Sequence, residues 1–354
     1  MAAILGKAWK GYQFLFEELS DPRTKEWLFV SKPYEVLTLL GLYLMFVFKW
    51  GPRFMKNRQP YNLDNILIAY NAIQVLASLY IFVNAITIAW GWDYKWVCEP
   101  VDFSYTEKAI QIAKFVYIYF LIKLVDLLDT VFFVFRKKYS QVSFLHIYHH
   151  TGMVLLVWGA VTYLPGGHGT LIGVINSFVH VVMYSYYLMT VAVPSTKNAI
   201  WIKKHVTQLQ ILQFFLCVVH MTVIVFKTDC EYPRWISAIF LPQNLFMLVL
   251  FIDFYIKAYI INPKKQSDSS TNSTKVSNHS KGSKHSNGHN NRIEKLKVKN
   301  GINDVIYETN KNDEKGTSPM YRKNNEINNT DSENNNLYVK GKEKIFTFGK
   351  SKTN

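Results

Sequence analysis

Charged residues are scarce in this chain of 354 residues, where Asp, Glu, Lys and Arg make up 18% and hydrophobic residues 49%. Apolar runs of 18 residues or more recur along residues 1–263, and most charges lie outside them. Runs of this length are typical of membrane-spanning helices, so they exclude a soluble globular enzyme and a single-span protein. The net charge of +15 is shared about equally between residues 1–263 and the remainder, so basic loops and a basic tail explain it without nucleic acid.

Cysteine is also rare, and three residues are too few for a disulfide scaffold. A cleavable signal is not evident, because residues 1–32 mix polar and aromatic residues without a continuous apolar core. No internal repeat stands out. These absences leave the apolar runs as the main guide to the fold.

The apolar runs predict an all-α polytopic membrane protein with seven transmembrane helices. Residues 1–33 form an N-terminal segment, residues 34–263 the membrane domain, and residues 264–354 a basic tail rich in Asn and Ser. The tail has too little apolar surface to fold alone, so we expect it to be disordered. The expected spans are 34–50, 64–91, 109–135, 142–164, 170–192, 205–226 and 237–260.

Lysine and arginine are concentrated in alternate loops, those after the first, third and fifth spans. The positive-inside rule therefore predicts that these loops and the C-terminal tail are cytosolic, and that the N-terminal segment is luminal. Tail sequons at Asn272, Asn278 and Asn328 would then stay unglycosylated. Lys350 and Lys352, near the C-terminus, resemble a dilysine signal for retrieval to the endoplasmic reticulum.

The same topology places Cys98 and Cys230 in two loops on the non-cytosolic side. In an oxidising lumen these two residues would form a disulfide bond, and the alternative is two unpaired loop thiols. Cys217 lies inside the sixth span, where we interpret it as a small packing residue.

The third span carries Lys123, Asp126, Asp129 and Thr130. The first three recur at steps of three residues, on neighbouring turns of one helical face. Two carboxylates and an ammonium group in hydrocarbon must face a protein interior. The pattern indicates either part of an active site or a structural ion-pair network between helices.

The fourth span opens with His146, His149 and His150, the pattern H-x-x-H-H. Steps of three and four residues place all three imidazoles on one face near the cytosolic end of the helix. Two chemistries fit the residues. One is metal ligation by imidazole, and the other is acid–base or nucleophilic catalysis near neutral pH.

Two further spans carry polar residues at helical spacing. The fifth holds Asn176 and His180, followed by Met183, Tyr184 and Tyr187, whose aromatic members alone would indicate packing. The sixth holds Thr207, Gln210 and Gln213, for which hydrogen bonding between helices is a serious alternative. With the two preceding sets, they would line one chamber that opens to the cytosol.

These four motifs, in this order, resemble the signature set of the family that elongates very long-chain fatty acids. The resemblance covers residues 30–265 and departs from the family pattern at Asp126, where Glu is common. It implies seven helices, the last six enclosing a narrow acyl tunnel. It also implies an endoplasmic reticulum enzyme, a 3-oxoacyl-CoA synthase that condenses acyl-CoA with malonyl-CoA and releases CO₂ and CoA.

Within that reading, His149 attacks the thioester to give an acyl-imidazole, with His180 as the partner imidazole. We expect His146 and His150 to orient the reacting groups, and Asp126 and Asp129 to fix the histidines or to engage Lys123. Oxyanion or enolate stabilisation would come from Asn176 and Tyr184. The expected substrate-binding residues are Thr207, Gln210, Gln213, Tyr187, Lys137, Lys138, Lys203 and Lys204.

Neither a cofactor nor a metal is expected, and the partners would be the bilayer and the reductases and dehydratase of the elongation cycle. The sequence leaves open whether the protein forms a homo-oligomer and which length of acyl chain it accepts. The main rival is a membrane di-iron desaturase or hydroxylase, but residues 1–263 supply only one histidine box. The other is a seven-span receptor or transporter, which would leave the four motifs unexplained.

Overall fold

The structure is a computed structural model that describes residues 1–193, 195–196, 199–261, 294–300 and 303–309. The chain divides into two compact units, Met1–His279 and Ser280–Asn354. All regular elements described in the first unit are helical, whereas the described elements of the second are strands. The predicted signal residues Lys350 and Lys352 and the three sequons lie outside the described residues.

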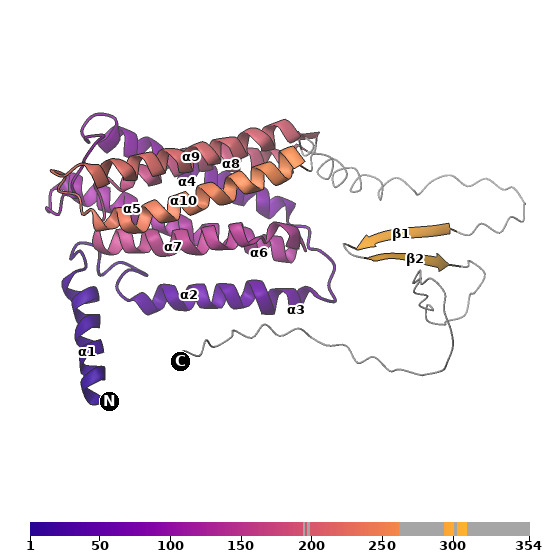
Figure 1. Ribbon diagram of the computed structural model, residues 1–354, viewed down its shortest axis with the longest axis horizontal. Coiled ribbons are helices and arrows are strands. Elements are labelled where there is room, and N and C mark those ends of the chain that lie inside the picture. Colours follow the sequence, from indigo (N-terminus) through magenta and orange to yellow (C-terminus); the bar gives the residue numbers. More distant parts are fainter. Residues whose placement is uncertain (194, 197–198, 262–293, 301–302, 310–354) are drawn as a thin grey trace, which may run out of the picture. The chain divides into compact units, whose positions relative to one another are not determined.

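The helices of the first unit follow one another along the chain, with the longest connections before α2 and α5 (Figure 1). The α-helices are α1 (Ala2–Gln13), α2 (Pro33–Met45), α3 (Gly51–Met55), α4 (Asp64–Ala85), α5 (Glu107–Asp126), α6 (Leu128–Phe135), α7 (Phe144–Tyr163), α8 (Thr170–Ala192), α9 (Ile200–Phe226) and α10 (Trp235–Tyr255). Short π-helical turns extend or join them at η1 (Phe14–Glu18), η2 (Phe46–Trp50), η3 (Ile86–Trp90) and η6 (Ile256–Ile261), and a 3₁₀ turn, η4 (Tyr139–Gln141), precedes α7.

Six helical runs of the described residues are long and apolar enough to cross a membrane. They are Pro33–Met55, Asp64–Trp90, Phe144–Tyr163, Thr170–Ala192, Ile200–Phe226 and Trp235–Ile261. They correspond to six of the seven predicted spans, and they make the chain a multi-pass membrane protein by length and composition.

The predicted span over residues 109–135 differs from the structure. It is divided at Leu127 into α5 and α6, and the Leu127 N–H bonds to the carbonyl of Leu124, three residues back, at 3.3 Å. This run is not among the six apolar ones, because Lys114, Lys123, Asp126 and Asp129 give it more charged residues than those runs carry. The predicted span over residues 109–135 is therefore not confirmed as a membrane-spanning helix, and it carries part of the candidate site.

Local sequence explains where several helices begin. Pro33 occupies the first turn of α2, where the missing N–H costs nothing. Thr106 caps α5 by accepting a hydrogen bond from the backbone N–H of Ala109. Ser143 caps α7 in the same way, and its Oγ lies 3.2 Å from the backbone nitrogen of His146. The cap therefore fixes the first turn of the helix that carries the histidine box.

Packing between helices brings distant parts of the sequence together. Helix α4 packs along α8, α9 along α10, and α5 along α7. Helix α2 lies beside α6 and α7 in Figure 1, and Tyr43 of α2 reaches Thr130 of α6 at 2.7 Å. Phe120, Val154 and Val161 are fully buried between α5 and α7. The polar residues singled out from sequence thus lie in a close-packed apolar surround.

The second unit contains an antiparallel pair of strands, β1 (Glu294–Asn300) and β2 (Asn303–Thr309), with Glu294 opposite Thr309. The sequence interpretation expected disorder in this tail, and that expectation stays a prediction. Apolar Leu296 and Val298 alternate with lysines, and this period of two residues is typical of a β-strand. The expectation of disorder for the rest of the tail concerns residues outside the described ranges.

Candidate active site

A buried ion pair in α5 is the centre of the polar cluster. Nζ of Lys123 lies 2.8 Å from Oδ2 of Asp126, and both side chains are almost fully buried. Because the two residues are three apart, they lie on the same face of the helix. Burial without a partner would be costly for either charge, so the pair requires its neighbours to complete the hydrogen bonding.

Helix α8 supplies the next partners. Nζ of Lys123 lies 3.1 Å from Oδ1 of Asn176 and 3.4 Å from Nδ1 of His180. An ammonium group can only donate, so Nδ1 of neutral His180 accepts and its proton sits on Nε2. Nδ1 of His180 also lies 3.7 Å from Oδ2 of Asp126. The predicted association of Lys123, Asp126, Asn176 and His180 is thus present in the structure.

Asp129 takes part through a tyrosine and not through Lys123. The hydroxyl of Tyr184 lies 2.7 Å from Oδ2 of Asp129 and 3.2 Å from Oδ1 of Asp126. The break at Leu127 separates Asp129 from the Lys123–Asp126 face that a continuous helix would have shared. Tyr184 is fully buried and bridges the two carboxylates across the helix junction.

Two residues of this cluster were missed by the sequence interpretation. The side-chain amide of Gln74, in α4, donates to Oδ1 of Asp126, and the hydroxyl of Tyr119, in α5, donates to Oδ1 of Asn176 at 2.7 Å. Gln74 is 1% exposed within an apolar helix. A polar amide in such a span is a signal in itself, and Asn71 and Ser78 lie on the same face. Nothing in the sequence distinguishes Tyr119 from a packing aromatic residue.

The three imidazoles of the histidine box lie together at the start of α7. The ring centres of His146 and His150 are 4.3 Å apart, and those of His149 and His150 are 5.5 Å apart. Nε2 of His146 lies 2.9 Å from Oγ1 of Thr130, which is in turn bonded to Tyr43. The box is therefore held by α6 and, through one hydroxyl, by α2.

His149 differs from the other members of the box. Its Nδ1 atom is buried and has no hydrogen-bond partner among the described residues. The same side chain lines an apolar cavity of about 290 Å³ whose walls come from α4, α5, α7, α8, α9 and α10. An unpaired imidazole nitrogen beside an apolar cavity is free to form a bond to something that enters it.

The cavity runs along the bundle away from the histidine box. Its α7 wall extends from His149 through Met153 and Ala160 to Tyr163 at the end of that helix. Tyr232 and Trp235 line the other end. The cavity thus has a polar group at one end and apolar walls beyond it.

The sixth-span residues divide between two places. Gln213 joins the cluster, because its Oε1 lies 3.4 Å from Nδ2 of Asn176. Thr207 instead bonds to the backbone of Lys203 at 3.0 Å and lies 3.4 Å from the hydroxyl of Tyr259. Gln210 makes a 3.5 Å contact with the sulfur of Met183. The single chamber expected from sequence therefore receives Gln213 through a hydrogen bond, whereas the bonds of Thr207 and Gln210 go elsewhere.

The remaining predicted substrate-binding residues lie at the periphery. Tyr187 follows Tyr184 by one helical turn and is 38% exposed. The ammonium group of Lys137 is 3.5 Å from the carbonyl of Lys56, and that of Lys204 lies over the ring of Tyr255. Lys138 precedes η4, and Lys203 lies in the first turn of α9. Their predicted role toward CoA stays a prediction.

No group of three or more His, Cys, Asp or Glu side chains in the described part of the chain is arranged to hold a metal ion. His146 is engaged with Thr130, and His180 with Lys123 and Asp126. These two imidazoles thus have hydrogen-bonding neighbours within the polar cluster.

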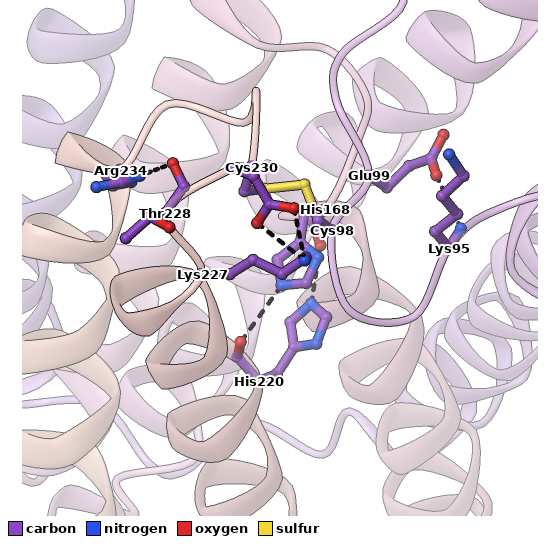
Figure 2. The surroundings of a disulfide bond; sticks show 10 residues. Lys95, Cys98, Glu99, His168, His220, Lys227, Thr228, Cys230 and Arg234 are labelled. Carbon is purple, nitrogen blue, oxygen red and sulfur yellow. Dashed lines mark hydrogen bonds and ion pairs between the residues drawn. A yellow bond between two sulfur atoms is a disulfide. The ribbon is translucent and has the colours of Figure 1, made fainter.

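The far end of the bundle is closed by the predicted disulfide bond, which the structure confirms between Cys98 and Cys230 (Figure 2). Cys217 is fully buried, as predicted for a packing residue. Next to the bridge, the rings of His168 and His220 stack at 3.6 Å, and each Nε2 bonds to the backbone carbonyl of the other residue. Burial lowers the pKa of His168, in the loop between α7 and α8, to about 4. We call this part of the bundle the disulfide end.

The sequence matches one family of known proteins and resembles several named relatives. Residues 28–267 match the family described as ELO: GNS1/SUR4 family. The chain is 38% identical over 272 residues to very long chain fatty acid elongase 7 of Drosophila melanogaster, covering 77% of this chain and 82% of that protein. It is 40% identical to elongase 7 of Rattus norvegicus, covering 68% and 86% of the two chains. It is 38% identical to elongase 4 of Homo sapiens, covering 70% and 78%.

Proposed function

Because this chain belongs to the ELO (GNS1/SUR4) family, we propose that it is a very-long-chain 3-oxoacyl-CoA synthase. Its relatives are named very long chain fatty acid elongases, which supports a role in fatty acid elongation. The proposed reaction condenses a long-chain acyl-CoA with malonyl-CoA and gives 3-oxoacyl-CoA, CO₂ and CoA. It is the first step of a two-carbon extension.

The observation that carries the proposal is the position of His149. Its unpaired, buried Nδ1 and its place in the wall of an apolar cavity suit a nucleophile that meets the thioester end of a lipid chain. The apolar walls from Met153 to Tyr163 suit the acyl chain itself. Six helices contribute walls to this space, which supports its use as the acyl tunnel.

In the first half-reaction, an imidazole nitrogen of His149 attacks the thioester carbonyl. The carbon–sulfur bond breaks, and CoA leaves as a thiolate that takes up a proton. The other ring nitrogen of His149 loses the proton that it carried. The acyl group is then held on His149 as an acyl-imidazole, whose nitrogen is a good leaving group toward carbon nucleophiles. The apolar walls protect this intermediate from water.

In the second half-reaction, malonyl-CoA loses CO₂ and the resulting enolate attacks the acyl carbonyl. A carbon–carbon bond forms and the nitrogen–carbon bond breaks. The departing ring nitrogen takes up a proton from solvent, which regenerates neutral His149. Negative charge develops on the enolate oxygen and then on the acyl oxygen. Nε2–H of His180, whose tautomer is set by Lys123, is a suitable donor to either oxygen.

The surrounding groups then have distinct roles. Asn176 accepts from both Tyr119 and Lys123, so its amide NH₂ stays available as a donor beyond the 3.4 Å contact with Gln213. Tyr184 donates its proton to the carboxylates and is better suited to holding Asp129 and Asp126 in place than to stabilising an oxyanion. Neither a metal nor a cofactor has a role in this scheme.

Our proposal places the protein in the endoplasmic reticulum membrane with the histidine box and the C-terminus toward the cytosol. Malonyl-CoA and acyl-CoA would then reach His149 from the cytosolic side. The proposed partners are the reductases and the dehydratase that complete each cycle.

The test is a condensation assay with purified protein in lipid vesicles, labelled malonyl-CoA and acyl-CoA of chain lengths from C16 to C24. Wild type should form labelled 3-oxoacyl-CoA, and a His149→Ala/His180→Ala variant should form none. Lys114→Met, an exposed residue on α5, is the matched control and should retain wild-type activity. Absence of product at every chain length, from protein that is folded and correctly inserted, would contradict the proposal.

A further inference from the structure

Helix α1 carries a continuous aromatic and aliphatic stripe. Leu5, Trp9, Tyr12 and Phe16 follow one another at steps of four, three and four residues, which places them on one face. The rings of Trp9 and Tyr12 stack at 5.6 Å, and those of Tyr12 and Phe16 are 5.0 Å apart. The stripe is therefore a single apolar surface along α1 and η1.

Most of this surface has no protein partner among the described residues. Leu5 is 69% exposed and Trp9 is 59% exposed, and Ile4, beside them, is 72% exposed. Exposure of this much apolar area on one helix face indicates a contact with something outside the chain.

The C-terminal end of the stripe is fixed to the bundle. Phe16 packs against Trp158 of α7, with ring centres 6.1 Å apart. Just beyond it, the backbone nitrogen of Asp21 lies 2.8 Å from the carbonyl of Thr162, and Oγ1 of Thr24 lies 2.7 Å from the carbonyl of Val161. These bonds hold the segment at the last turn of α7, at the disulfide end.

This attachment orients the helix. Phe16 faces a residue inside a membrane-spanning run, so the stripe that contains it faces the same side. Figure 1 shows α1 running crosswise to the bundle from the place where α7 ends. A crosswise helix at the end of the spans, with its apolar face toward them, lies at the level where a bilayer has its polar surface.

The polar face of α1 has the composition of a helix that lies at a membrane surface. It carries Lys7 and Lys10, and the helix Ala2–Gln13 contains neither Asp nor Glu. Lysine on the polar face and Trp and Tyr on the apolar face are typical of a helix that lies in a membrane interface. Phosphate oxygens of lipid headgroups are the complementary partners for the two ammonium groups.

We propose that α1 is an interfacial helix that docks on the lipid surface at the disulfide end of the bundle. The hydrocarbon boundary covers the stripe of Leu5, Trp9 and Tyr12, while Lys7 and Lys10 face headgroup phosphates. A second copy of the chain and bulk water are the two other possible neighbours of the stripe. This proposal is independent of the proposed catalytic reaction.

The experiment places an environment-sensitive thiol probe at single sites of the full chain in phosphatidylcholine vesicles that contain phosphatidylserine. Leu5→Cys and Ala8→Cys report the apolar face, and Lys10→Cys is the matched site on the polar face. The natural cysteines do not compete, because Cys98 and Cys230 are bridged and Cys217 is buried. Wild type treated with the probe is the blank.

Brominated acyl chains should quench the probe at residues 5 and 8 but not at residue 10, and aqueous iodide should do the reverse. Quenching by iodide at all three sites would overturn the proposal and place the helix in water. Residues 5 and 8 could instead be protected from both quenchers, with the protection lost when the protein is diluted in excess lipid. That result would overturn the proposal and show that a second copy of the chain covers the stripe. The use of two sites on the apolar face guards against one substitution that disturbs the helix.

Discussion

Nζ of Lys123 and Oδ2 of Asp126 lie 2.8 Å apart in the interior of the helix bundle, and both side chains are almost completely buried. Removal of one charge leaves the other in an apolar surround without its counter-ion. We therefore expect Lys123→Met to lower the free energy of unfolding by about 3–5 kcal/mol.

The test is chemical or thermal unfolding of the variants in detergent. Lys123→Met/Asp126→Leu should recover much of the loss, because no unpaired charge remains. Lys114→Met, at an exposed position of the same helix, should leave stability unchanged. Equal destabilisation by the single and double variants would show that the pair is not the source of the effect.

The hydroxyl of Tyr43 links α2 to the histidine box through Thr130. Tyr43→Phe removes this bond and keeps the ring, so it should lower the free energy of unfolding by about 1 kcal/mol. Tyr105→Phe, at a residue that is 70% exposed, is the matched control. In Tyr43→Phe/Thr130→Val the two effects should be less than additive, because both remove the same bond. Simple additivity would contradict the link.

The disulfide bond joins residues 132 positions apart in the sequence. Its loss should destabilise the protein by several kcal/mol, about 5 kcal/mol in the chain-entropy account. Cys98→Ser and Cys230→Ser should each abolish the mobility difference between reduced and non-reduced protein on gels. Cys217→Ser should keep that difference. A mobility difference that persists in Cys98→Ser would contradict the pairing.

The stacked pair of His168 and His220 predicts a dependence of stability on pH. The pKa of His168 is lowered to about 4, from an ordinary value near 6.5, because the ring is buried. Between these values the unfolded chain binds a proton that the folded chain does not, so stability falls as the pH falls. His168→Gln should be less stable at pH 7 and should lose less stability between pH 7 and pH 5.

The measurement is the thermal unfolding midpoint of the two proteins at several pH values. Histidines away from this pair contribute equally to both curves, so the difference between the slopes belongs to His168 and its stacked partner His220. Parallel curves for wild type and His168→Gln would contradict the prediction.

Spacing along single helices predicted a large part of this site. H-x-x-H-H places His146, His149 and His150 together, and the step of three residues places Lys123 beside Asp126. Such relationships depend only on helical geometry, which the sequence specifies directly. For the same reason, six of the seven predicted spans correspond to apolar helices in the structure.

Relationships between helices were harder to predict. Gln74, Tyr119 and Tyr43 each reach the site from a neighbouring helix or turn. Such contacts depend on how two apolar helices are aligned, which cannot be deduced from the sequence of either helix. No Pro or Gly lies beside Leu127, so the sequence contains no signal for the break in the helix there. The sequence did not suggest the strands Glu294–Asn300 and Asn303–Thr309, because the polar composition of the tail outweighed a short alternation.

We propose that His149 carries the acyl group, and the most direct test is a mass measurement. Purified protein is incubated with a long-chain acyl-CoA in the absence of malonyl-CoA, then quenched, digested and mapped. We predict that wild type gains the mass of the acyl group on the peptide that contains His149, that malonyl-CoA removes it, and that His149→Ala gains none. An adduct that persists in His149→Ala and disappears in His180→Ala would contradict the claim and assign the nucleophile to α8.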